Sequence, residues 1–138
     1  MQQVSTRAAT KIAGITPASW RQSINRGDFP CAPAVREGQR MWAPDDLLVL
    51  CWHSALIKSG MRRPMAGGLA GLLRKAIAAD PDAETLSVYT WSERTKGHLA
   101  VGRTPPVEDA VRIMDIPVVH WRRNVADAIA RVRKHGRS

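Results

Sequence analysis

The stretch GITPASWRQSINRGDFP, residues 14–30, predicts a helix with a clear start and a clear end. Thr16 suits the N-cap position, and Pro17 fits the first helical position because its missing N–H would be unpaired there in any case. Gly27 is a residue type that often follows the last helical turn, since glycine adopts a left-handed backbone without strain. We therefore expect a helix over residues 17–26.

This predicted helix has two chemically different faces. Trp20 and Ile24 are four residues apart, so they share one face, which can be buried. The opposite face carries small or hydrogen-bonding side chains at helical spacing: Ala18, Arg21, Gln22 and Asn25. Arg, Asn and Gln offer paired hydrogen bonds to guanine and adenine edges, so the helix is suited to the major groove of DNA.

The next segment, CAPAVREGQRMWAP (residues 31–44), predicts two short extended pieces on either side of a turn. Its centre, Glu37-Gly38-Gln39, suits a hairpin. Because Arg36 and Arg40 flank the turn, we expect residues 33–43 to form a basic wing.

Three more helices are predicted in the first 80 residues. They are expected over residues 6–13, 44–59 and 65–79. Pro44 and the two acidic residues after it form a typical helix start, because acidic side chains complement the helix dipole there. In the last of these helices, Gly67, Gly68 and Gly71 each cost about 1 kcal/mol relative to Ala, and such small residues predict a close helix–helix contact.

Beyond a break at Asp80-Pro81-Asp82, the pattern changes to strands. Strands are expected over residues 86–92, 98–103 and 110–116, with the first hairpin around Gly97, and a final helix from Pro117 to about Lys134. The fold class is therefore α+β, with residues 1–80 as one unit and residues 84–138 as a second. We expect the final helix to cover one face of this small sheet.

The other face of the sheet needs a cover as well, because both faces carry apolar residues. One hypothesis is that a second copy of the chain supplies it, so that residues 84–138 mediate homodimerisation around a pocket of Tyr89, Trp91 and Trp121. The alternative is that the third and fourth helices of the same chain cover that face.

Charge and composition limit the classes of possible partner. The 138 residues carry a formal net charge of +9, with an ordinary apolar content of 44%. The excess of positive charge lies at the two ends of the chain, and the middle is nearly neutral. A strongly basic protein favours a polyanionic partner, most often nucleic acid.

The cellular compartment follows from a few features. Cys31 and Cys51 are the only cysteines, and no signal peptide is recognisable, which favours a reducing compartment. The longest apolar run, residues 47–57, is too short to span a bilayer. We expect a cytoplasmic, nucleoid-associated protein without a membrane partner.

The first 65 to 80 residues resemble the winged helix-turn-helix of the MerR superfamily, which includes excisionase-like and prophage-regulator proteins. Gly14-Ile15-Thr16-Pro17 with Arg21 is similar to the MerR turn and the start of its second helix. INRGDFP (24–30) is closer to the excisionase-like branch, and EGQRMWAPDDLLVLCWHSALIKSG (37–60) is similar to the wing and the helix that follows it. The resemblance stops near residue 80, and no coiled coil or metal-binding cysteine loop follows, so metal sensing is not supported.

This resemblance implies a sequence-specific regulator of transcription that binds double-stranded DNA, without enzymatic activity and without a cofactor. The expected base contacts are Ser19, Arg21, Gln22 and Asn25. The expected contacts to the DNA backbone are Arg7, Lys11, Thr16, Arg26, Arg36 and Arg40. The alternatives are an excisionase-like or nucleoid-architectural protein that bends DNA, and a protein-interaction adaptor with a degenerate winged helix.

Other candidate sites are weaker. Cys51 and His53 are two residues apart and do not face each other on a helix, so we expect no metal site there. No nucleophile or pair of carboxylates stands at a spacing that suggests catalysis. The basic residues of the last helix, such as Arg122 and Arg131, are expected to be solvated or to add phosphate contacts.

Overall fold

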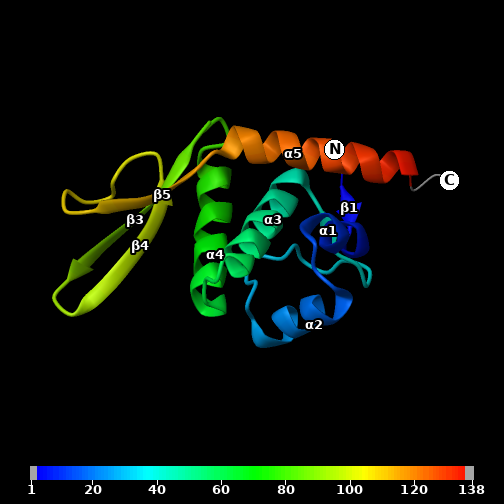
Figure 1. The fold of residues 1–138 in the computed structure, drawn as a ribbon, viewed down its shortest axis with the longest axis horizontal. Helices are drawn as coiled ribbons and strands as arrows, with labels where there is room; N and C mark the ends of the chain where they lie inside the picture. Colours follow the sequence, from blue (N-terminus) through cyan, green and yellow to red (C-terminus); the bar gives the residue numbers. More distant parts are fainter. Residues whose placement is uncertain (1–2, 136–138) are drawn as a thin grey trace.

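The computed structural model describes residues 3–135, which form five helices and two small antiparallel sheets. In chain order these are β1 (Val4–Ser5), α1 (Thr6–Ala13), α2 (Pro17–Arg26), β2 (Met41–Trp42), α3 (Pro44–Lys58), α4 (Arg63–Ala79), β3 (Leu86–Glu93), β4 (Lys96–Gly102), β5 (Val111–Ile116) and α5 (Val118–His135). The expected α+β class is confirmed. The helices form the body of the molecule, and the three-stranded sheet projects from one end of it (Figure 1).

Helix α3 is the centre of the fold, because it packs against α1, α4 and α5. Its apolar run is buried around most of the helix: Leu47, Leu48, Val49, Leu50, Trp52 and Leu56 are all buried. A helix that is apolar on every side must be enclosed by other elements. The other helices are therefore arranged around α3 (Figure 1).

Helices α1 and α2 have the predicted bounds, and local caps explain them. The side chain of Thr16 accepts a hydrogen bond from the Ser19 N–H at 3.1 Å, and Pro17 opens the helix. Gly27 ends it with a φ of 71°, in the left-handed region that favours glycine. On the inner side, Trp20 packs edge-on against the fully buried Trp42, with ring centroids 5.4 Å apart.

The segment after α2 differs from the predicted hairpin. Arg36 and Gln39 form a tight turn, with backbone hydrogen bonds of 2.7 and 3.0 Å, but no two-stranded ribbon extends from it within the described residues. Met41–Trp42 pairs instead with Val4–Ser5. The reason is the burial of Trp42, whose indole N–H donates to Thr6 Oγ1 at 3.0 Å and holds β2 against the start of α1.

The glycines of α4 make a close contact, although not with another helix as expected. Gly67 lies against the backbone of Asp28 in the loop after α2, and a Cβ added there would overlap the Asp28 carbonyl oxygen. Pro30 of the same loop lies beside Gly67 and Gly71. The small residues of α4 therefore let the loop after α2 pack directly against this helix. This contact fixes the path of the chain after α2.

The three-stranded sheet has the order β4-β3-β5. The turn between β3 and β4 lies at Arg94-Thr95, and Gly97 pairs with Ser92 inside the ladder, so the predicted turn position was wrong. Arg94 has a φ of 56°, which a tight turn requires. In β5, Ile113 is skipped between the pairs Val88–Met114 and Tyr89–Arg112, which marks a β-bulge.

The final helix does not cover the sheet as expected. Helix α4 packs against β4, whereas α5 packs along α3 and crosses the body of the molecule (Figure 1). The apolar stripe of α5, which includes Val125 and Ile129, belongs to the same buried cluster as Leu48 and Leu86. The segments 3–80 and 84–134 therefore share one hydrophobic core.

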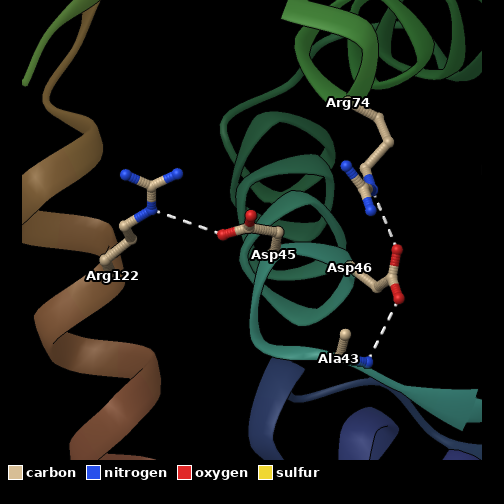
Figure 2. A network of polar contacts seen from close by, with 5 residues as sticks. All are labelled: Ala43, Asp45, Asp46, Arg74 and Arg122. Carbon is tan, nitrogen blue, oxygen red and sulfur yellow. Dashed lines mark hydrogen bonds and ion pairs between the residues drawn. The ribbon is translucent and has the colours of Figure 1, made fainter. Parts of the chain in front are cut away.

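Two neighbouring carboxylates at the start of α3 tie three helices together (Figure 2). Asp46 accepts hydrogen bonds from Arg74 Nε of α4 at 2.8 Å and from the backbone N–H of Ala43 at 3.1 Å. Asp45 accepts from Arg122 Nε of α5 at 3.3 Å. The first turn of α3 thus holds α4 on one side and α5 on the other.

No helix within residues 3–135 combines the length and the apolar character needed to cross a membrane.

Candidate nucleic-acid interface

The outer face of α2 carries the polar residues that the sequence singled out. Arg21, Gln22 and Asn25 are exposed, whereas Trp20 and Ile24 on the inner side are half-buried. Ser23 is buried below the helix. The helix is therefore anchored by its inner side and presents hydrogen-bonding groups to the outside.

The first turn of α2 uses its hydroxyl groups for its own cap. Thr16 donates its hydroxyl to Ser19 Oγ at 3.0 Å and accepts from the Ser19 backbone N–H. Both side chains remain exposed. They can contact a ligand only while they also hold the start of the helix.

A hollow of about 620 Å³ between α1 and α2 brings together cations from both helices. Arg7 and Lys11 of α1 line it together with Trp20 and Arg21 of α2. A second hollow of about 380 Å³ lies between the start of α1 and the 35–40 turn, and Arg7 lines this one too. Arg7 therefore joins two adjoining hollows on one side of the molecule.

The tight turn is flanked by two arginines that differ in exposure. Arg36 is exposed, whereas Arg40 is half-buried and donates from its guanidinium to the Pro33 carbonyl oxygen. Arg40 also lines the second hollow, beside Arg7. Because the Arg40 guanidinium is hydrogen-bonded within this loop, Arg36 is the more accessible of the two cations at the turn.

The remaining predicted site residues lie away from these hollows. Gln22, Asn25 and Arg26 are exposed along the second half of α2 and line neither hollow. The structure therefore brings Arg7, Lys11 and Arg21 together around one hollow, and places the rest along the same helix or at the neighbouring turn.

A smaller cavity lies beneath α2, and sequence reasoning did not find it. Its volume is about 180 Å³, and it is lined by Trp20 and Ser23 of α2, by His53 of α3 and by the first turn of α4 at Arg63. Burial lowers the pKa of His53, so the ring is neutral. The only signal in the sequence is that His53 and Ser54 interrupt the apolar run 47–57.

The expected aromatic pocket in the second half of the chain does not form. Tyr89 is buried and its hydroxyl donates to the Arg103 carbonyl oxygen at 3.3 Å. Trp91 stacks on His98, with ring centroids 5.2 Å apart. Trp121 lies on α5 in a groove with Cys51 and Val125, because α5 packs on α3 and not on the sheet.

The cysteines do not form a reactive or metal-binding centre in the described part of the chain. Cys31 and Cys51 are both free, and burial raises the pKa of each thiol to about 11. A thiol with so high a pKa is protonated at neutral pH and is a poor nucleophile. Residues 3–134 also hold no cluster of metal-ligating side chains.

The basic residues of α5 lie across the body of the molecule from α2, with α3 between the two helices (Figure 1). Arg122 is engaged by Asp45 and by the Pro81 carbonyl oxygen at 2.6 Å. Arg133 donates to the Gln3 carbonyl oxygen at 3.2 Å. These two arginines hold the helix in place.

No protein-family model matches this chain, and no curated protein matches it. Its function is therefore inferred from its residues and their geometry.

Proposed function

We propose that this chain is a sequence-specific regulator of transcription that binds double-stranded DNA through a winged helix-turn-helix of the MerR-like kind. Helix α2 would enter the major groove, and the segment 33–43 would lie on the adjacent backbone. The observation that carries this proposal is the outer face of α2, where Arg21, Gln22 and Asn25 are all exposed. These are the side-chain types that form paired hydrogen bonds with purine edges.

The cations around α2 support a fit to the DNA backbone. Arg7 and Lys11 lie across the hollow from Arg21, so they can reach a phosphate while α2 occupies the groove. Arg36 is exposed at the tight turn whose neighbouring residues Val35 and Arg40 line the second hollow with Arg7, and it can contact the backbone from there. Binding should therefore weaken steeply with salt, because each neutralised phosphate releases counterions.

A dimer would place two copies of α2 on an inverted repeat about one helical turn apart. The exposed apolar residues of β5 support an interface there, since Val111 is 59% and Ile113 is 53% exposed. β5 lies at an edge of the sheet, where an unpaired backbone can accept a second strand. We propose homodimerisation through this edge.

The test is selection of bound duplexes from a random library, followed by fluorescence anisotropy titrations of the selected sequence and a shuffled control. We expect a recurring inverted repeat that binds at least about 1,000-fold more tightly than the control. Enrichment of no sequence, together with equal and weak affinity for all duplexes, would contradict specific recognition.

A second candidate is a protein that bends DNA, and it has one observation in its favour. Val35, which is 55% exposed, stands beside Arg36 at the turn. Apolar side chains next to arginines can wedge between base steps and kink the duplex. Footprinting separates the two candidates, because a regulator protects one palindrome and an architectural protein gives an extended ladder.

A further inference from the structure

The cavity beneath α2 contains an unpaired polar atom. His53 is 3% exposed, and its Nε2 is buried without a hydrogen-bond partner in the described part of the protein. A buried polar atom that finds no partner is costly, and such atoms in a folded protein point to a missing one. His53 lines the cavity, so a molecule inside it can supply that partner.

The chemistry of the missing partner follows from the other side of the imidazole ring. The backbone of Asp28 raises the pKa of the ring and so favours its protonated form, as a hydrogen-bond acceptor beside it does. We assign Nδ1 as the nitrogen that faces the Asp28 backbone, since Nε2 is buried without a partner in the described part of the chain. In a neutral ring Nε2 then carries a lone pair, and it requires a donor such as an O–H group.

The walls of the cavity are mostly apolar. Ile15, Trp20, Phe29, Leu50 and Ile57 surround it. Its volume of about 180 Å³ is close to that of an apolar cavity of about 150 Å³ that binds benzene. A single aromatic ring therefore matches the space and the surface.

Two cations line the same cavity and are exposed to solvent. Lys58 ends α3 and Arg63 begins α4, and both side chains are exposed although they contribute to the lining. Lys58 makes a long hydrogen bond of 3.4 Å to the Ala13 carbonyl oxygen, which leaves its other donors free. The lining therefore offers two cations with which a bound carboxylate can pair.

We propose that this cavity binds a small aromatic carboxylic acid that carries a ring hydroxyl. The ring fills the apolar space, the hydroxyl donates to His53 Nε2, and the carboxylate pairs with Lys58 and Arg63. A water molecule at Nε2 would satisfy the imidazole but would leave the apolar walls and the two cations without a role.

The position of the cavity links it to the outer face of α2. Ser19, Trp20 and Ser23 line the cavity from the inner side of the same helix that carries Arg21 and Asn25. A bound ring therefore shifts or stiffens α2 and changes its affinity for DNA. This coupling rests on the proposed function, whereas the binding site does not.

The first test uses 4-hydroxybenzoate as the probe, without DNA, by calorimetry and by amide chemical shifts. We expect saturable one-to-one binding, with shifts centred on α2 and on residues around His53. Benzoate, which lacks the donor, and methyl 4-hydroxybenzoate, which lacks the charge, should each bind about tenfold more weakly. If none of the three probes binds at millimolar concentration, the cavity holds water alone and the proposal is wrong.

Variants test which groups recognise the probe. His53→Asn keeps a donor for Asp28 and removes Nε2, so it should bind 4-hydroxybenzoate and benzoate with equal affinity. The double variant Lys58→Gln with Arg63→Gln, at two exposed positions, should bind 4-hydroxybenzoate and its methyl ester with equal affinity. Arg123→Gln on α5 is the matched control. A folded His53→Asn protein that still prefers the hydroxylated acid would overturn the assignment.

The second test adds DNA and keeps the two proposals separate. With a selected duplex, saturating 4-hydroxybenzoate should change DNA affinity by at least about fivefold, and DNA should change probe affinity by the same factor. Probe binding without any DNA binding would contradict the proposed function alone. DNA binding that is unchanged by a bound probe would contradict the coupling alone.

Discussion

Arg74 donates from Nε to Oδ1 of Asp46 at 2.8 Å, while the other oxygen of the same carboxylate accepts from the backbone N–H of Ala43 (Figure 2). The Asp46 side chain is only 14% exposed. One carboxylate therefore caps α3 and holds α4 against it. Asp45, the preceding residue, does the same for α5 through Arg122.

Replacing Asp46 by Ala should lower the free energy of unfolding by about 1–3 kcal/mol, because it leaves a helix start and a half-buried guanidinium without a partner. Urea denaturation followed by circular dichroism measures the change. Asp127→Ala, at an exposed position on α5, is the matched control and should stay within about 0.5 kcal/mol of the wild type. Equal stability of both variants would show that the contact contributes nothing.

Two neighbouring glycines in α4 should respond to alanine in opposite directions. At Gly67 the added Cβ meets the Asp28 carbonyl, so Gly67→Ala should lower stability by about 1–3 kcal/mol. At Gly68 a Cβ meets nothing within 4 Å, so Gly68→Ala should raise stability by about 0.5–1 kcal/mol through helix propensity. Thermal and urea unfolding of the pair decide this, and the same sign for both would argue against the loop contact.

On DNA, Arg21→Ala should lower affinity for the selected sequence by about 1–3 kcal/mol and relax the preference at one base position. Arg36→Ala should instead weaken binding to all sequences about equally and reduce the salt slope by about 1. Arg123→Ala, at an exposed position on α5, should change neither quantity. Anisotropy titrations from about 50 mM to about 200 mM salt measure all three.

His53 should make stability depend on pH. Burial lowers the pKa of His53 below its ordinary value of 6.5, so the folded state binds its proton less readily than the unfolded state. The contribution of neutral His53 is complete above pH 6.5 and is lost as pH falls through the folded-state pKa. In that window the unfolding free energy should fall by at most about 1.4 kcal/mol per pH unit.

Urea titrations at a series of pH values, with His53→Asn as the comparison, isolate this contribution. The variant should show a flatter pH dependence below 6.5 than the wild type. Parallel profiles for wild type and His53→Asn would contradict a buried neutral imidazole.

The proposed dimer depends on the edge of the sheet. Val111→Lys combined with Ile113→Lys should convert a dimer to a monomer, because both side chains are exposed and apolar on β5. Val119→Lys, an exposed apolar position on α5, is the control that should stay dimeric. Sedimentation velocity distinguishes the species, and a monomeric wild type at all concentrations would refute the dimer.

The parts of the fold that sequence predicts are those fixed by local chemistry. The bounds of α2 follow from a cap at Thr16 and a glycine at Gly27, and both features act within a few residues. The exposure of Gln22, on the side of α2 opposite the half-buried Trp20 and Ile24, follows from helical spacing in the same way. These signals need no knowledge of the rest of the chain.

The other parts of the fold depend on contacts between residues that are far apart in the sequence. β2 pairs with β1 and not with the turn before it, because Trp42 is bound by Thr6. α5 packs against α3 and not against the sheet, because its apolar stripe is buried on α3. The cavity around His53 is built from the α1–α2 turn and from three helices, so no single stretch of sequence could indicate it.

The hydrogen bond between Arg133 and Gln3 brings residue 3 beside the last turns of α5, across the molecule from α2 (Figure 1). A surface linker attached at either residue would lie away from α2, so the protein can be immobilised for binding measurements with that helix unobstructed.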